Sequence, residues 1–499
     1  MNPASLLRAP RSPMLWIALL ACVLALAGLG LRGIWDPDEG RYTNVAMNML
    51  SSGDWLNPHR NDDVGHWTKP PLTYWAIASS VGLLGHTPFA ARLPSALAYL
   101  LLVGLAWRSA RRLVPGGETV AALAYATMLL PFAASQLITT DPFLAACQGL
   151  AMYGFVEARF GDRPRPRRWL LLMWAAFGLA FLTKGPPALL PLLAIIAFDL
   201  LRGGKTGHRL FNISGAVVFL LLALPWYLAV IRGNPGLLHY FIGDEVYNRI
   251  ATNEFGRHGE WYGWLKVYLP TLLLGSLPWT PVLLRWARGL PADLQRWRQR
   301  DARAHDRAGL LLTLWVLLPL LVFCLARSRL PLYLLPLFLP LSLLVARQWV
   351  AEGRRLPHWG WFAAWAAMLL GLKLYAAGMD TSKDAAGWAR AIRDRARGPI
   401  HEVNAINDLP RYGLNLELGV QVERISVQPI ADAPRFNPDF DEDLAFELSE
   451  SEPGVIWMTP LAQLPAVRQR VEALGYRIQP LGTPYRDRVI FRIDRAVTR

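Results

Sequence analysis

The chain has 499 residues, of which 53% are hydrophobic and only 18% are charged, and it contains 21 tryptophans. This composition is too apolar for an ordinary soluble domain, and tryptophan favours membrane interfaces. A formal net charge of +15 would suggest nucleic acid as the partner of a soluble protein. Here the lysines and arginines concentrate in loops between apolar runs, as the positive-inside rule describes. The sequence therefore predicts a membrane protein with no nucleic-acid partner.

The first apolar run, from Met14 to Leu31, is about 18 residues long, near the minimum for crossing a membrane. It has no evident small-residue cleavage site and is interpreted as a first span rather than a signal peptide. The three cysteines (Cys22, Cys147 and Cys324) lie far apart in apolar runs, so no disulfide framework is predicted. Phosphate-loop, zinc-ligand and Ser-His-Asp signatures are not apparent.

A polar loop, residues 35–75, follows the first run and begins with three acidic residues, Asp36, Asp38 and Glu39. Apolar residues after them recur at helical spacing, which predicts an amphipathic helix on the membrane surface that ends near Gly53. Its predicted apolar face consists of Tyr42, Val45, Ala46, Met49 and Leu50. The two carboxylates at its start could be functional or could simply cap the helix.

Further apolar runs, each near the length of one crossing, fill the chain up to about residue 379. They lie at 72–85, 93–107, 119–138, 142–158, 169–183, 186–201, 210–231, 264–284, 309–326, 330–346 and 359–377. From about residue 380 the composition becomes that of a soluble domain. Residues 380–499 are predicted to form a small α/β domain, with strand-like stretches at 424–430, 454–458 and 488–493 and a helix at 466–474.

The distribution of basic residues predicts the orientation. If the short run at 72–85, which starts with two prolines, stays on the outer face, then most loop arginines fall on the inner side. This choice predicts about eleven crossings, a cytoplasmic N-terminus and an outer C-terminal domain. The unusual polar clusters then all share the outer face, where ionisable groups near a membrane often mark a site. They include Asp38, Glu39, Lys69, Asp141, Lys184, the 244–257 segment, Arg327 and Arg329.

Cations among carboxylates at a membrane surface suit a reacting anionic lipid head group, because arginine and lysine bind phosphate. A carboxylate near an acceptor hydroxyl can serve as a general base. Each residue also has a simpler interpretation. The lysines and arginines could extend from span ends to the head groups, and Asp141 could cap the helix that Pro142 begins.

Several motifs, in this order, resemble those of a family of integral-membrane glycosyltransferases. The motifs are PDEGRYTNVAMNMLSSGDWLNPH, WTKPPLTYW, TDPFLA, LTKGPPALLPLL, HYFIGDEVYNRI, GSLPW and ARSRLPLYLLP. The family comprises polyprenyl-phosphate-sugar-dependent enzymes related to protein O-mannosyltransferases. Within it, the chain is most similar to the bacterial undecaprenyl-phosphate-aminoarabinose transferases that modify lipid A. The resemblance covers roughly residues 36–336.

The resemblance implies an all-α polytopic GT-C fold of about 11–13 spans with juxtamembrane helices, plus a C-terminal α/β domain in the periplasm. It implies transfer of a sugar from undecaprenyl phosphate to a lipid or glycan acceptor, such as lipid A, at the bacterial inner membrane. Carried over by motif, the catalytic residues would be Asp38, Glu39 and Asp141. The donor phosphate would be bound by Lys69, Arg249, Arg327 and Arg329. Other cavity residues would be Arg41, Tyr42, Lys184, Glu245 and Tyr333.

The sequence departs from the aminoarabinose enzymes at three places. Thr68 stands where they have a glutamate, Val246 where they have a histidine, and Arg327 and Arg329 where they have lysines. These changes leave a divalent metal and the identity of the sugar open. Transfer to protein, as in O-mannosyltransferases, remains an alternative. A lipid-linked-sugar transporter and a structural scaffold are alternatives of other classes, although a transporter should show midplane polar sites and internal repeats.

Overall fold

The computed structural model describes residues 13–162, 166–202, 209–248, 257–355, 359–430, 435–450 and 453–496. Contacts divide the chain into two compact units. Unit 1 comprises residues 1–27 and 95–373, and unit 2 comprises residues 28–94 and 374–499. The first polar loop thus belongs to the same unit as the C-terminal domain, whereas the sequence analysis grouped it with the spans. A domain boundary at residue 379 therefore separates segments that pack together.

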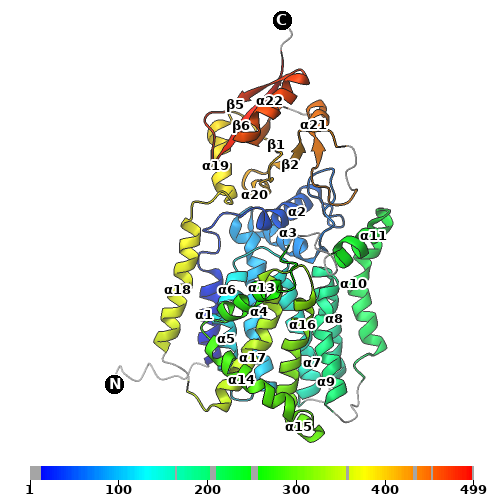
Figure 1. Cartoon of the computed structure of the whole chain (residues 1–499), viewed down its shortest axis with the longest axis vertical. Helices are drawn as coiled ribbons and strands as arrows, with labels where there is room; N and C mark the ends of the chain where they lie inside the picture. The colour runs from blue at the N-terminus through cyan, green and yellow to red at the C-terminus, as the bar shows by residue number, and fades with distance from the viewer. Residues whose placement is uncertain are drawn as a thin grey trace. The chain divides into compact units, whose positions relative to one another are not determined.

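Unit 1 is helical, and its long helices run side by side (Figure 1). Its first helices are α1 (Pro13–Leu26), α4 (Pro88–Leu113), α5 (Glu118–Thr127), α6 (Leu129–Ala134), α7 (Asp141–Phe160), α8 (Pro166–Lys184), η2 (Pro186–Leu189) and α9 (Leu190–Leu201). They are followed by α10 (Ile213–Gly233), α11 (Leu237–Ile242), η3 (Gly243–Asn248), α13 (Gly263–Gly275), α14 (Thr280–Arg296), α15 (Arg300–His305), α16 (Arg307–Leu325), η4 (Pro331–Leu337), α17 (Phe338–Ala351) and α18 (Trp359–Gly378).

Five of the described helical segments are long and apolar enough to cross a bilayer. They are 88–113, 213–233, 307–325, 331–351 and 359–378. The pair α13 and α14 would make a sixth, but it bends by 119°. The protein is therefore a polytopic helical membrane protein, as predicted, while the predicted count of about eleven crossings stays a prediction. The run at 72–85 forms α3 (Leu72–Leu84), whose 13 residues span about 20 Å, too short to cross.

Two apolar runs that the sequence analysis treated as continuous are broken, and the two breaks meet. Met128 is extended between α5 and α6, and residues 276–279 separate α13 from α14. The backbone N–H of Leu129 donates to Leu277 O at 3.2 Å. Three side chains donate hydrogen bonds to polar atoms next to the first break. Tyr99 donates to Ala126 O (2.6 Å), Trp365 to Thr127 O (2.8 Å) and Trp279 to Thr127 Oγ1 (2.8 Å). Irregular backbone inside a helical membrane protein needs such partners.

Unit 2 contains a six-stranded sheet in the order β3-β2-β1-β4-β6-β5. The strands β1 (Glu402–Ile406), β2 (Gln421–Ser426), β3 (Glu442–Asp443) and β4 (Val455–Pro460) are parallel. The hairpin of β5 (Tyr476–Pro480) and β6 (Arg488–Arg495) is antiparallel and joins the sheet through β4. The three strand-like stretches predicted from sequence overlap β2, β4 and β6, and the predicted helix is α22 (Leu464–Ala473). The sheet thus confirms a small C-terminal α/β domain.

Helices cover both faces of this sheet (Figure 1). α19 (Ala385–Arg395) and α20 (Leu414–Leu418) pack with Val403, Val422 and Ile456 on one face. α21 (Leu444–Glu450) and α22 pack with Ile406, Ile425 and Trp457 on the other. Because alternate strand residues point to opposite faces, β1, β2, β4 and β6 each supply residues to both cores.

The predicted amphipathic helix is α2 (Asp38–Ser52), which ends at Gly53 in a left-handed conformation. Of its predicted apolar face, Val45, Ala46 and Met49 are buried. The structure differs from the prediction in what covers the polar face. Asn44 and Asn48 are also buried, and their Oδ1 atoms both accept hydrogen bonds from Asn415 in α20, each at 2.8 Å. The helix is therefore packed into unit 2 on both sides rather than having a solvated polar face.

Replacing Trp365 with Phe should leave the buried Thr127 carbonyl without its indole donor. An unsatisfied buried polar group costs about 1–3 kcal/mol, so we expect a melting midpoint several degrees below that of the wild type in detergent. Trp361→Phe is the matched control, because Trp361 is in the same helix and 74% exposed. Equal midpoints for the two variants would contradict the proposed role of this hydrogen bond.

Candidate functional site

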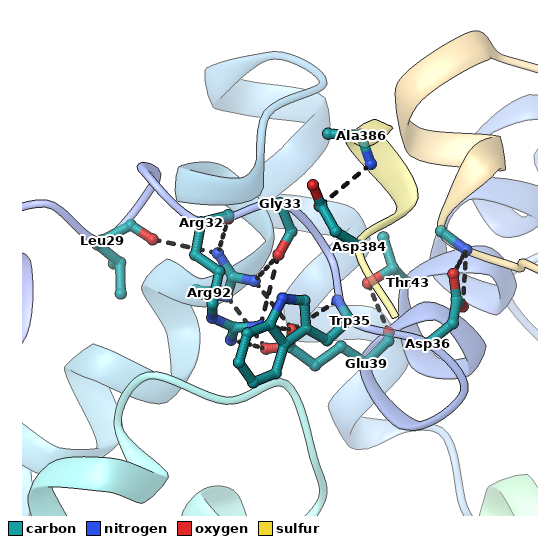
Figure 2. Close-up of polar contacts among 11 residues, drawn as sticks. Leu29, Arg32, Gly33, Trp35, Asp36, Glu39, Thr43, Arg92, Asp384 and Ala386 are labelled. Carbon is teal, nitrogen blue, oxygen red and sulfur yellow. Dashed lines mark hydrogen bonds and ion pairs between the residues drawn. The ribbon is translucent and has the colours of Figure 1, made fainter. Parts of the chain in front are cut away.

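The start of the first loop is fixed by an ion-pair network around Glu39 (Figure 2). The Glu39 carboxylate is 2% exposed and accepts two hydrogen bonds from Arg32, at 2.7 and 2.8 Å. It accepts two more from Arg92, at 2.9 and 3.1 Å, and one from the Trp35 backbone at 2.9 Å. Burial alone would raise the pKa of Glu39, but the charges of Arg92 and Arg32 outweigh it and lower the pKa to about 2. Glu39 is thus ionised, and its hydrogen bonds hold the start of the loop in place.

Arg92 also holds the backbone of residues 29–33, which precede α2. It donates to the carbonyl oxygens of Leu29, Arg32 and Gly33. Arg32 in turn lies over the Trp35 ring, 4.2 Å from its centroid. The sequence analysis missed both arginines, because each lies at the end of an apolar run and looks like an interfacial anchor. The six residues between Arg32 and Glu39 are therefore tightly held.

Glu39 is buried, whereas the neighbouring acid, Asp38, is exposed. Its side chain is 81% exposed, and its ion pair with Arg41 is long, at 3.7 Å. The family resemblance implied a catalytic role for both of these adjacent carboxylates. The geometry leaves Asp38 accessible and buries Glu39.

Lys69 lies at the other end of the loop, immediately before Pro70, Pro71 and α3. Its ammonium group donates to the Thr68 carbonyl. Close by, His66 is 2% exposed and its Nε2 lies 2.8 Å from the Thr68 hydroxyl. Burial, followed by the charges of Arg41, Arg60 and Lys69, lowers the pKa of His66 well below its usual value. The charges of Arg41, Arg60 and Lys69 around His66 make a cationic environment that suits an anion.

Tyr42 and Tyr74 complete this part of unit 2. Their rings stack with centroids 5.8 Å apart, and the His66 ring meets Tyr74 edge-on at 5.9 Å. The stack joins α2 to α3 and holds the segment that carries Lys69 between them.

The other site residues predicted from sequence lie in unit 1. Asp141, at the start of α7, is 6% exposed and forms an ion pair with Lys184, the last residue of α8, at 2.5 Å. The Lys184 ammonium lies 4.3 Å from the centroid of the Tyr333 ring. The Tyr333 hydroxyl accepts a hydrogen bond from Arg257 at 3.2 Å. The structure thus links Asp141, Lys184 and Tyr333, and adds Arg257, which the sequence analysis had not placed in the site.

The two arginines of the ARSRLPLYLLP motif differ sharply. Arg329 is 3% exposed and donates to the carbonyl oxygens of His258, Glu260 and Cys324. It therefore holds the backbone around residue 258. Arg327 is exposed, and no ion pair or hydrogen bond joins it to the described part of the chain. Glu245 accepts a hydrogen bond from the Tyr240 hydroxyl at 3.3 Å, and Arg249 lies outside the described residues.

Metal-ligand geometry is found away from these groups. Among the described residues, the one set of three side chains spaced to hold an ion consists of Glu402, Glu423 and Glu447 in the C-terminal domain. None of the site residues predicted from sequence belongs to it.

The fold defines a polytopic helical membrane protein with an additional α/β domain. Each unit holds a group of cations and carboxylates: Asp38, Arg41 and Lys69 in unit 2, and Asp141, Lys184 and Arg257 in unit 1. Over residues 68–228 the chain matches the family model described as dolichyl-phosphate-mannose-protein mannosyltransferase. A crystal structure of ArnT from Cupriavidus metallidurans bound to undecaprenyl phosphate aligns with 96% of this chain and 97% of that one, with a TM-score of 0.77 and 22% identity. The chain therefore shares the GT-C fold of ArnT.

Two sequence relatives are named undecaprenyl phosphate-alpha-4-amino-4-deoxy-L-arabinose arabinosyl transferase. The one from Sodalis glossinidius (strain morsitans) is 36% identical over 348 residues, which cover 67% of this chain and 59% of the relative. The one from Enterobacter sp. (strain 638) is 33% identical over 354 residues, covering 68% and 60%. The alignments therefore span about three-fifths of each relative's length.

Replacing Arg92 with Met should leave Glu39 with one guanidinium and free three carbonyl oxygens. Breaking a buried ion pair costs about 3–5 kcal/mol, so we expect a large drop in melting midpoint or loss of the monodisperse protein in gel filtration. Arg41→Met is the matched control, because the ion pair of Arg41 with Asp38 is long and exposed. A midpoint for the Arg92 variant equal to that of the control would show that the network is dispensable.

A second buried acid, Asp36, makes the stability of the folded chain depend on pH. Asp36 is 3% exposed and accepts hydrogen bonds from the Gly413 backbone at 3.1 and 3.3 Å. Burial raises the pKa of Asp36 from 3.8 to about 8. Between these values the folded chain holds a proton that the unfolded chain releases, so this group's contribution to stability is lost as the pH rises toward 8.

We therefore expect the melting midpoint of Asp36→Asn to fall less between pH 6 and pH 8 than that of the wild type. Asp162→Asn, at a side chain that is 85% exposed, should keep the wild-type slope. An unchanged slope in the Asp36 variant would mean that this carboxyl is ionised in the folded protein.

Proposed function

We propose that the protein transfers a sugar from undecaprenyl phosphate to an acceptor in the cell envelope, such as lipid A, on the periplasmic side of the bacterial inner membrane. One observation carries the proposal. The first loop presents an accessible carboxylate, Asp38, together with Arg41 and Lys69, in a chain related to aminoarabinose transferases. The ArnT structure, which holds undecaprenyl phosphate, supports the same class of donor.

In this mechanism Lys69 and Arg41 bind the donor phosphate. The bond between the anomeric carbon and the phosphate oxygen breaks, and the electron pair stays on undecaprenyl phosphate, whose added charge the two cations stabilise. Preorganised charges of this kind act on the transition state because the protein does not have to rearrange around the leaving group.

The acceptor oxygen forms the new bond to the anomeric carbon. If the acceptor is a hydroxyl, Asp38 takes its proton. If the acceptor is a phosphate, no base is needed, and Asp38 binds polar groups of the sugar. Glu39 and Arg329 position backbone and are not assigned to the reacting groups, and no step passes through a metal ion.

The group in unit 1 has a separate role in this proposal. The Asp141 carboxylate neutralises Lys184, so this pair presents polar atoms without net charge. Together with Tyr333 and Arg257, the pair suits a ligand that carries hydroxyl groups. Glu245 is assigned to the same polar lining.

The test is release of undecaprenyl phosphate, measured by mass spectrometry. Purified full-length protein in lipid nanodiscs is incubated with a panel of undecaprenyl-phosphate sugars and lipid A. Wild type should consume one donor. Lys69→Ala should lower the rate about 100- to 1000-fold, because it removes the cation that stabilises the leaving phosphate. Asp38→Asn should lower it to a similar degree for a hydroxyl acceptor and much less for a phosphate acceptor.

Matched controls are Lys266→Ala and Asp162→Asn, whose side chains are 51% and 85% exposed. Both should keep wild-type rates. If wild type consumes no donor and instead moves intact lipid-linked sugar across vesicles, the protein is a transporter. If release occurs but Lys69→Ala is as active as Lys266→Ala, the phosphate is bound elsewhere.

A further inference from the structure

Unit 1 contains a cavity that none of the residues in the proposed reaction lines. Its volume is about 700 Å³, which is within the size range of sites for small molecules. It lies among four helices and is lined by Met14 in α1, Arg108 in α4, Tyr153 in α7 and Trp169 in α8. A second cavity of about 280 Å³ adjoins it, because Arg108, Arg111, Tyr153 and Trp169 line both.

One face of α4 supplies most of the lining of the larger cavity. Its residues there are Leu101, Gly104, Leu105, Arg108 and Arg111. Spacings of three and four residues place side chains on the same side of a helix. At 1.5 Å per residue, the apolar part of this face extends about 10 Å from Leu101 to Arg108. The face is therefore apolar at one end and cationic at the other, as in a binding site for an amphiphile.

The positive charge at the cationic end is not neutralised by the chain. Arg112 forms an ion pair with Glu157 at 3.2 Å and a second one with Asp162. Arg108 and Arg111 are exposed, and no hydrogen bond or ion pair joins either to a residue that the structure describes. Like charges three or four residues apart on a helix repel each other. A bound anion would relieve this repulsion.

Gly104 widens the cavity beside the backbone of α4. Glycine inside a helix is less favourable than alanine, and packing explains other glycines of this unit. A Cβ atom on Gly149 would lie 2.7 Å from Leu102, and one on Gly154 would lie 2.8 Å from the Trp169 carbonyl oxygen. A Cβ atom on Gly104 would meet no heavy atom of a neighbouring residue within 4 Å. The space above Gly104 is thus open to another molecule.

Aromatic rings lie where the apolar and cationic parts of the cavity meet. The rings of Tyr153 and Trp169, which line both cavities, are edge-on with centroids 5.6 Å apart. The Tyr153 hydroxyl donates to Glu157 at 3.1 Å, which fixes the ring. Tyrosine and tryptophan are enriched at the depth of lipid head groups. Their position favours a ligand whose polar group lies at the edge of the bilayer.

We propose that this cavity binds an anionic phospholipid such as phosphatidylglycerol. Its phosphate would bind Arg108 and Arg111, because guanidinium groups bind phosphate oxygens bidentately. One acyl chain would lie over Gly104, between Leu101 and Met14. Basic pockets between spans bind anionic lipid head groups in this way.

The basic residues predict that this end of unit 1 faces the cytoplasm, so the lipid would belong to the inner leaflet. By contacting α1, α4 and α8 together, it would stabilise the packing of these helices. The inference does not depend on the proposed transferase activity, because the two share no residue.

Native mass spectrometry of the delipidated full-length protein in detergent provides the test, with the melting midpoint as a second readout. The protein is titrated with phosphatidylglycerol, phosphatidylethanolamine or inorganic phosphate. We expect phosphatidylglycerol to be retained at concentrations where phosphatidylethanolamine is not, and to raise the midpoint saturably. Inorganic phosphate should leave the midpoint unchanged, because it cannot occupy the apolar part.

Two variants alter the two parts of the cavity separately. Replacing Arg108 and Arg111 together with Gln should weaken the binding of phosphatidylglycerol about 30-fold, from about a factor of five for each arginine near an anionic lipid. The matched control replaces Arg288 and Arg298, two exposed arginines outside the cavity, with Gln and should bind as wild type does.

Gly104→Leu fills the apolar part without changing the charge and should abolish the lipid-dependent rise in midpoint. Gly289→Leu is its control, because a Cβ atom at that helical glycine also meets nothing within 4 Å. If the double arginine variant cannot be purified, the pair of glycine variants carries the test.

Three results would overturn the proposal. Equal affinities of the two double variants would mean that Arg108 and Arg111 only stabilise the end of the helix and its orientation in the membrane. Equal retention of phosphatidylethanolamine would indicate nonspecific lipid around the protein. A midpoint that rises as much with inorganic phosphate would indicate a site for a soluble anion.

Discussion

The ion-pair network of Glu39, Arg32 and Arg92 is the interaction on which the first loop depends. Two guanidinium groups around one buried carboxylate require an excellent geometry to offset desolvation, and five hydrogen bonds to Glu39 supply it. Because Arg92 also holds three backbone carbonyls, the entry of the chain into α2 is fixed in position. The loop can therefore carry reactive groups without being mobile at its base.

In this arrangement the adjacent residues Asp38 and Glu39 differ: Glu39 is buried in the ion-pair network, and Asp38 is exposed. In a helix, neighbouring side chains point in directions about 100° apart. Once Glu39 is directed inward, Asp38 is directed outward and remains accessible. The same division recurs between Arg329, which binds three carbonyls, and Arg327, which is exposed. In both motifs one residue of a close pair is structural, and the other is available for a ligand.

Local patterns predicted the helices well. The spacing of Val45, Ala46 and Met49, with Gly53 after them, located α2, and the two prolines before Leu72 located the start of α3. What could not be predicted depends on contacts between distant residues. Arg92 looked like an anchor at the end of a span, because its partner is 53 residues away. The breaks at Met128 and near Leu277 were hidden for the same reason, since each is stabilised by the other. The role of each motif residue and the placement of Arg249 stay predictions.

The pairing of the first loop with the C-terminal domain has a consequence for biosynthesis. Asp36 bonds to Gly413, which is 377 positions later in the chain, and the backbone of Ile34 accepts from Ala385. The loop leaves the ribosome well before its partners, because several hundred residues separate them. The loop cannot pack against these partners while the intervening helices are being synthesised and inserted. These contacts of the loop can consequently form only after residues 385–413 have been synthesised.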